Sequence, residues 1–151
     1  ELGMHRQVQL IVSGGIRSGA DVAKALALGA DAVSIGVAAL IAIGDNAPEL
    51  EDEYAKIGSA AGYYDDWHEG RDPAGIFTQD DELAARFDPE LGGRRLANYL
   101  RTLVLETQTL ARACGKSRVQ NLEPEDLVAL TVEAAAMARV PLAGTNWIPG
   151  T

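Results

Sequence analysis

The sequence predicts an α/β fold in which two strand–helix units are followed by a helical C-terminal region. Two short apolar runs each end at a glycine turn, and a stretch of helical periodicity follows each turn. Helical periodicity then returns from residue 78 and continues almost to the end of the chain. Strands that alternate with helices favour a parallel sheet.

The first strand is predicted over Val8–Val12, a β-branched and mostly apolar run that ends at Ser13-Gly14-Gly15. The helix that follows begins at Ser18, which is a suitable N-cap residue, with Asp21 three positions later as in a capping box. Gly29 is expected to end this helix.

The second unit repeats this order. The run 32–35 predicts a strand, Gly36 closes it, and the helical stretch 37–43 ends at Gly44. Residues 45–75 are rich in Gly, Asp, Glu and Tyr and show little periodicity, apart from a short helix expected over 48–57. A loop of this length inside a compact domain tends to be functional or disordered.

From residue 78 the chain is predicted to be helical. A short helix ends near Phe87, Asp88-Pro89 marks another start, and a long helix covers 94–113. One face of that helix carries Leu96, Leu100, Leu103, Thr107, Leu110 and Cys114, so a buried and inert thiol is expected. A final helix is predicted from Pro124, with an apolar side formed by Leu127, Leu130, Thr131, Ala134 and Ala138.

We therefore divide the chain into three parts: two βα units over 1–44, a loop or insertion over 45–77, and a helical tail over 78–151. The 151 residues are few for a complete (β/α)8 barrel, which usually needs about 250. The net charge of −9 argues against nucleic-acid binding, and no apolar stretch is long enough to span a bilayer. The first residues lack signal-peptide features, so a cytoplasmic location is expected, although this N-terminus need not be the natural one.

The chemistry-bearing residues follow the two predicted strands. Glycine at Gly14, Gly15 and Gly36 allows backbone N–H groups to approach an anion without a Cβ in the way. One such turn alone is better explained as a tight turn. Two turns in this order and spacing favour a phosphate site, because the loops after strands seven and eight of (β/α)8 enzymes often hold a phosphate.

The neighbouring residues complete the candidate site. Arg17 either adds a positive charge near the phosphate or lies exposed at the barrel rim, and the sequence favours neither. His5 and His68 are far apart and show no metal-ligand spacing, so no metal site is predicted.

The motif Ser13-Gly14-Gly15-Ile16-Arg17-Ser18-Gly19, with the stretches 22–30 and 33–36, resembles phosphate-binding and FMN-dependent barrels in general, including inosine-monophosphate dehydrogenases. The stretches 36–44 and 73–80 and the tail from Leu96 narrow this resemblance to the synthase domain of glutamate synthase large subunits. Residues 64–73, 113–116 and 121–127 look most like the glutamate-synthase-like subunit of N-methylglutamate synthases.

The resemblance implies a C-terminal part of an FMN-type (β/α)8 barrel, with FMN held by Ser13, Gly14, Gly15, Arg17, Gly36 and Val37. It implies an oxidoreductase that reduces a 2-imino acid made from an amine or ammonia and a 2-oxo acid, giving glutamate or N-methylglutamate. The implied partners are the remainder of the barrel, in the same or a separate chain, and amidotransferase-like and other synthase subunits in an oligomer. The family's substrate-contacting residues lie on earlier strands, so this segment alone is expected to be inactive.

One departure from the family concerns its iron–sulfur cluster, which is usually held by three cysteines ahead of the segment 73–80. The two nearest positions here are Trp67 and Asp72, and the earlier one is Ala61 or, with an insertion, Asp45. A cluster needs thiolates, so none is expected. Two alternatives remain open: a non-catalytic structural or assembly subunit, and another phosphate-binding barrel similar to inosine-monophosphate dehydrogenase.

Overall fold

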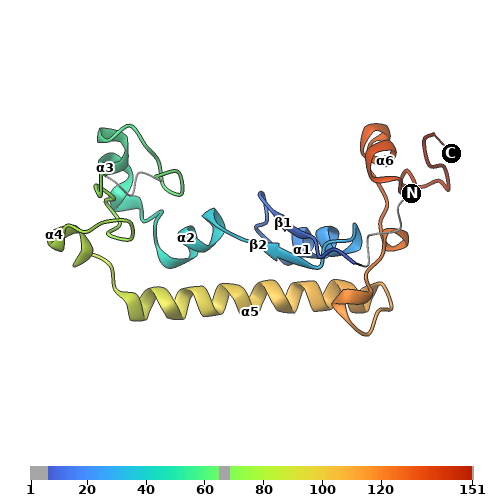
Figure 1. The fold of residues 1–151 in the computed structure, drawn as a ribbon, viewed down its shortest axis with the longest axis horizontal. Helices are drawn as coiled ribbons and strands as arrows, with labels where there is room; N and C mark the ends of the chain where they lie inside the picture. The colour runs from blue at the N-terminus through green and yellow to red at the C-terminus, as the bar shows by residue number, and fades with distance from the viewer. Residues whose placement is uncertain (1–6, 65–68, 151) are drawn as a thin grey trace. The chain divides into compact units, whose positions relative to one another are not determined.

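The computed structural model describes residues 7–64 and 69–150, and it divides the chain into two compact units (Figure 1). The first unit combines Glu1–Ser34 with Thr102–Thr151, and the second is Ile35–Arg101. The longest helix, α5 (Pro89–Ala113), begins in the second unit and ends in the first. Each unit has its own hydrophobic cluster or clusters, and each is described below by itself.

The first unit contains the predicted strand–helix–strand motif. Strand β1 (Ile11–Ser13) and strand β2 (Ala32–Ser34) pair in parallel, and helix α1 (Gly19–Ala27) connects them. The register places Ser13 opposite Ser34, so both strands end at the same level. The α/β class with parallel strands is thereby confirmed.

Helix α1 packs on the C-terminal part of α5 within this unit. Its buried residues Ala23 and Ala27 form a cluster with Ala111 of α5 and Leu122. Small side chains at these positions allow the two helices to approach each other closely. The 3-10 turn η3 (Val119–Asn121) covers one side of the cluster through Val119.

The part of the chain from Pro124 onward was predicted as one final helix, but the structure has two separate elements there. The 3-10 turn η4 (Pro124–Asp126) is followed by extended backbone at Leu127, and α6 (Val132–Ala138) starts only after Thr131. The Thr131 side chain accepts a hydrogen bond from the N–H of Ala134, so it caps a new helix and does not continue an old one. Leu130, expected to be buried, is 85% exposed.

The second unit holds α2 (Val37–Ile43), the 3-10 turn η2 (Pro48–Leu50), α3 (Glu51–Lys56), α4 (Asp81–Ala84) and the start of α5. The expected short helix over 48–57 is therefore present as η2 and α3. Helix α5 starts at Pro89, because the Asp88 carboxylate accepts hydrogen bonds from the N–H groups of Glu90 and Leu91. The apolar cluster of this unit centres on Tyr54, Tyr64 and Ala74.

The buried face of α5 agrees with its prediction only at Leu103 and Thr107. In the C-terminal half of the helix the buried residues are Leu103, Thr107 and Ala111, a row with a spacing of four, whereas Leu100 and Leu110 are more than a third exposed. Cys114 lies just beyond the helix and is exposed, so the expectation of a buried thiol was wrong. The cause is the packing of α1 on α5. The small residues of α1 contact a row of α5 residues spaced four apart, and not the predicted face with alternating spacings of four and three.

Candidate functional site

The turn after β1 has the backbone that glycine favours. Gly14 and Gly15 have φ values of +100° and +71°, in the left-handed region that L residues seldom occupy. No heavy atom lies within 4 Å of the place where a Cβ would be at either residue, so the turn is open on that side. Backbone conformation, and not crowding, is therefore what requires glycine at these two positions.

Asp21 organises the second half of this turn. Its Oδ2 accepts hydrogen bonds from the N–H of Arg17 at 3.1 Å and from the N–H and hydroxyl of Ser18 at 3.1 and 3.0 Å. The Lys24 ammonium lies 3.2 Å from the other carboxylate oxygen. The Arg17 N–H and the Lys24 ammonium are the largest causes that lower the pKa of Asp21 to about 2. The N–H groups of Arg17 and Ser18 thus already have an anionic partner.

Replacing Asp21 by asparagine is expected to lower the free energy of unfolding by about 1 kcal/mol, the usual value for losing an N-terminal capping interaction. Because the pKa of Asp21 is lower in the folded state, its contribution is complete above pH 3.8 and disappears as the pH falls toward about 2. Urea unfolding at near-neutral pH and at about pH 3 measures both effects. Asp52→Asn, at an exposed position, is the control, and equal losses for the two variants would contradict the assignment.

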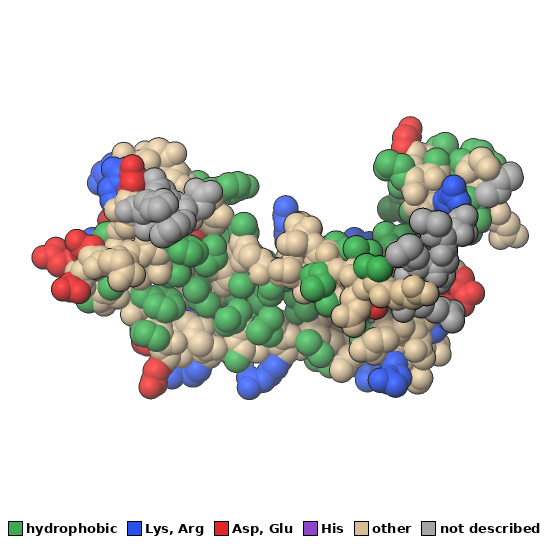
Figure 2. Space-filling view, in the orientation of Figure 1, with side chains coloured by type: hydrophobic (Ala, Val, Ile, Leu, Met, Phe, Trp, Pro, Cys, Tyr) green, Lys and Arg blue, Asp and Glu red, His purple; other side chains and the backbone are tan. Residues whose placement is uncertain are grey.

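The second predicted turn opens α2 in the other unit. Gly36 is the N-cap residue of α2, and its carbonyl accepts hydrogen bonds from the N–H groups of Ala39 and Leu40. The first N–H groups of a helix, here those of Val37 and Ala38, have no partner within the helix. Val37 is 47% exposed, and hydrophobic side chains gather on the surface around α2 (Figure 2).

Ser13, Gly14, Gly15 and Arg17 thus belong to the first unit, and Gly36 and Val37 to the second. Ser13 and Ser34, the last residues of the two strands, are paired, so the chain leaves both strands at the same end of the pair. Sequence reasoning recognised Asp21 as a capping residue but missed that its carboxylate also takes the Arg17 N–H. The Arg17 side chain is exposed.

The start of β1 and the residues just before it have apolar side chains that stay exposed within the first unit. Val8, Leu10 and Ile11 are each more than half exposed, and Ile11 is 66% exposed. Strands of parallel sheets are normally buried on both faces and paired on both edges. The described part of the chain contains only these two strands in a sheet.

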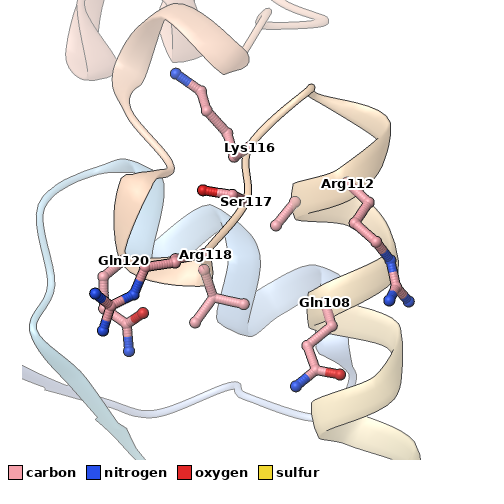
Figure 3. A pocket seen from close by; sticks show the side chains of 8 residues that line it. Gln108, Arg112, Lys116, Ser117, Arg118 and Gln120 are labelled. Atoms are coloured by element: carbon pink, nitrogen blue, oxygen red, sulfur yellow. The ribbon is translucent and has the colours of Figure 1, made fainter.

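A cavity lies at the C-terminal end of α5, with a volume of about 430 Å³, and Arg112, Lys116 and Arg118 line it. Figure 3 shows these three cationic side chains pointing away from one another. Lys116 is ion-paired with Glu123, Glu125 and Asp126 at 3.0–3.3 Å, and the Glu125 carboxylate is the largest cause that raises its pKa. The cavity therefore lacks a converging positive charge, and we assign it no ligand.

No group of three or more potential His, Cys, Asp or Glu metal ligands occurs within residues 7–64 and 69–150. His5, His68 and Trp67 lie outside these ranges. Over the same residues, no helix has both the length and the apolar character that crossing a membrane requires.

Comparison with known proteins places this chain in one family. Residues 1–49, which include both glycine turns, match the model of the conserved region in glutamate synthase. The chain is 74% identical over 150 residues to a glutamate synthase large subunit-like protein of Rhizobium meliloti, covering 99% of this chain and 34% of the relative. It is 36% identical over 148 residues to an archaeal-type glutamate synthase [NADPH] of Dehalococcoides mccartyi, covering 95% and 26%.

The archaeal glutamate synthase [NADPH] of Methanocaldococcus jannaschii is 39% identical over 122 residues, covering 81% of this chain and 21% of the relative. No solved structure matches the chain. The chain thus spans about a third of the length of its Rhizobium relative and less of the others. With the conserved region matched over both glycine turns and 74% identity along nearly all its residues, the chain belongs to the glutamate synthase family.

Proposed function

We propose that this chain supplies the FMN phosphate site of a glutamate synthase-like oxidoreductase, as the last two βα units and helical tail of an FMN-type (β/α)8 barrel. The observation that carries the proposal is the pair of parallel strands ending in register at Ser13 and Ser34, each followed by a glycine turn and a helix. In (β/α)8 enzymes the loops at this edge of the sheet carry the active site, and those after the last two strands frequently bind a phosphate.

The chain's own residues fit that role at the first turn. Gly14 and Gly15 have a left-handed backbone, and the space where a Cβ would lie at each of them is open. Asp21 orders the Arg17–Ser18 backbone beside them and occupies its donors, so the phosphate would be held by Gly14 and Gly15. The family resemblance implies Gly36 and Val37 as further phosphate contacts, and these two residues belong to the second unit.

The reaction proposed for the whole protein is reduction of a 2-imino acid, formed from a 2-oxo acid and an amine or ammonia, to glutamate or N-methylglutamate. FMN, when bound, supplies the hydride for such a reduction. The phosphate-binding residues of this chain would position the flavin, whereas the groups that contact the substrate are expected on upstream strands. We assign no catalytic role to any described residue.

The exposed residues Val8, Leu10 and Ile11, at and just before β1, support the proposal that the remainder of the barrel packs here, in the same or a separate chain. Two strands cannot close a barrel by themselves. We accordingly expect the 151 residues alone to catalyse nothing. Amidotransferase-like and other synthase subunits are the further partners that this assignment implies.

The test is flavin binding, measured by visible absorbance and isothermal titration with FMN. The chain alone should bind no FMN, and the same chain with its upstream barrel restored should bind it. In the restored protein, the double variant Gly14→Ala, Gly15→Ala should weaken binding at least about tenfold, equivalent to about 1.4 kcal/mol. Gly144→Ala is the matched control, because Gly144 also has a positive φ and open space around it. Absence of flavin from the restored protein would favour a structural or assembly subunit.

A further inference from the structure

The segment that follows α2 is organised around three buried polar side chains. Tyr54 is 1% exposed, Asp45 2% and Asp72 0%, and these are the largest fully buried side chains described. The Tyr54 hydroxyl lies 2.5 Å from Oδ1 of Asp45 and 2.9 Å from Oδ1 of Asp72. We call these three residues the Tyr54 hub.

The hub ties together backbone from the whole segment. Asp72 accepts hydrogen bonds from the N–H groups of Ala74 at 3.1 Å and of Ile76 and Phe77 at 2.8 Å each. Asp45 accepts one from the N–H of Gly62. The end of α2, helix α3 and the turns at 62 and 72–77 are therefore joined at one point.

An apolar shell closes the hub against water. The side chains packed around it are Leu50, Ile57, Ala61, Tyr64, Ala74, Ile76 and Phe77. No buried side-chain nitrogen or oxygen in residues 7–64 and 69–150 is without a hydrogen-bond partner. Buried polar networks fix a single arrangement of the chain only when every member is satisfied, as here.

The iron–sulfur cluster that the family resemblance implies for this segment does not fit these residues. A cluster needs cysteine thiolates, and the single cysteine of the chain, Cys114, lies outside residues 45–77. Asp72 stands at one position where the resemblance expects a cysteine, and Asp45 is the alternative to Ala61 for another. Both carboxylates are already occupied by the Tyr54 hydroxyl and backbone N–H groups.

We infer that the Tyr54 hub replaces the iron–sulfur cluster as the internal cross-link of residues 45–77. A metal cluster joins distant parts of a loop through thiolates, whereas the hub joins them through carboxylates that accept hydrogen bonds. The described residues of this segment then form a structural module held by hydrogen bonds in place of an iron–sulfur cluster. The inference goes beyond the proposed flavin site, and its test requires no flavin.

The two carboxylates should respond differently to removal of their charge. Both oxygens of Asp72 accept from backbone N–H groups, so the amide introduced by Asp72→Asn would place its NH₂ against at least one donor. In Asp45, one oxygen accepts from Gly62, and among the described residues the other has only the Tyr54 hydroxyl as a partner, which can also accept. Asp45→Asn can therefore keep both contacts, whereas Asp72→Asn cannot.

The experiment measures hydrogen–deuterium exchange at the amides of Gly62, Ala74, Ile76 and Phe77 in the full-length protein. The iron content of the same protein is measured as well. Tyr54→Phe and Asp72→Asn should each speed exchange at these amides at least about tenfold, and Asp45→Asn should change it less. Tyr63→Phe is the control, because Tyr63 is 77% exposed. Tyr54→Phe retains the buried ring, so it tests the hub even if Asp72→Asn does not fold.

Two results would overturn the inference. One is unchanged exchange at all four amides in Tyr54→Phe. The other is stoichiometric iron and acid-labile sulfide in the wild-type protein, with faster exchange at the same amides after chelation. Wild-type protein without iron, together with faster exchange in Tyr54→Phe, would establish the hub as the cross-link whether or not FMN binds.

Discussion

Replacing Gly19 by alanine is expected to destabilise the protein by about 2–3 kcal/mol, in the range of overpacking substitutions. A Cβ on Gly19 would overlap the Cβ of Glu106, and it would lie 2.6 Å from the backbone nitrogen of Thr107 and 2.7 Å from the carbonyl oxygen of Leu103. Two of these atoms belong to the backbone of α5, so no side-chain rotation can relieve the clash. The start of α1 must move away from α5.

That movement would also break two hydrogen bonds between the helices. The Gly19 N–H donates to Oε2 of Glu106 at 2.8 Å, and the Thr107 hydroxyl lies 3.2 Å from the Gly19 carbonyl. Gly19 follows the Arg17–Ser18 turn directly, so under the proposed function its displacement should also weaken FMN binding in the restored barrel. The loss of stability is measured by urea unfolding of the full-length protein.

Gly93→Ala is the matched control for this substitution. Gly93 is also helical, and no atom lies within 4 Å of the place of its Cβ. Alanine there is expected to stabilise α5 by about 0.5–1 kcal/mol, because glycine loses more backbone entropy in a helix. If both variants were stabilised, the close approach of α1 to α5 would be wrong.

The local features of the fold could be predicted from the sequence, because the residues that determine them are close together in the chain. Glycine turns after apolar runs predicted both βα units, and Asp88-Pro89 predicted the start of α5. The contact of Gly19 with Glu106 could not be predicted, because it joins residues 87 positions apart. Nothing in the local pattern distinguishes Gly19 from any other residue of a helix start.

The Tyr54 hub was missed for a related reason. Residues 45–77 have little periodicity, so the sequence contains no indication of which polar side chains are buried. In the sequence, Asp45 and Asp72 are notable only because they stand where the resemblance would allow a cysteine. In the structure, both carboxylates are hydrogen-bond acceptors. The buried face of α5 was predicted only in part for a similar reason, because the row Leu103, Thr107 and Ala111 faces α1, which the leucines of α5 alone do not indicate.

The second large effect is expected at alkaline pH. Burial, followed by the hydrogen bonds to Asp45 and then Asp72, raises the pKa of Tyr54 far above its ordinary value of 10.0. The folded protein therefore keeps the phenol proton, whereas the unfolded chain releases it above pH 10.0. The contribution of Tyr54 to the free energy of unfolding is fully present below pH 10.0 and is lost as the pH rises, by up to about 1.4 kcal/mol per pH unit.

The measurement is the free energy of unfolding between about pH 9 and about pH 11.5, for wild type, Tyr54→Phe and Tyr63→Phe. Tyr54→Phe should be less stable at neutral pH, because it loses the hydrogen bonds of the hydroxyl to Asp45 and Asp72. It should lose less stability as the pH rises, because phenylalanine has no proton to release. The exposed Tyr63→Phe should keep the wild-type slope. Lysine and arginine titrations are common to all three proteins, so the difference in slope isolates Tyr54. Parallel curves for wild type and Tyr54→Phe would mean that the phenol releases its proton in the folded state, which is incompatible with a closed hub.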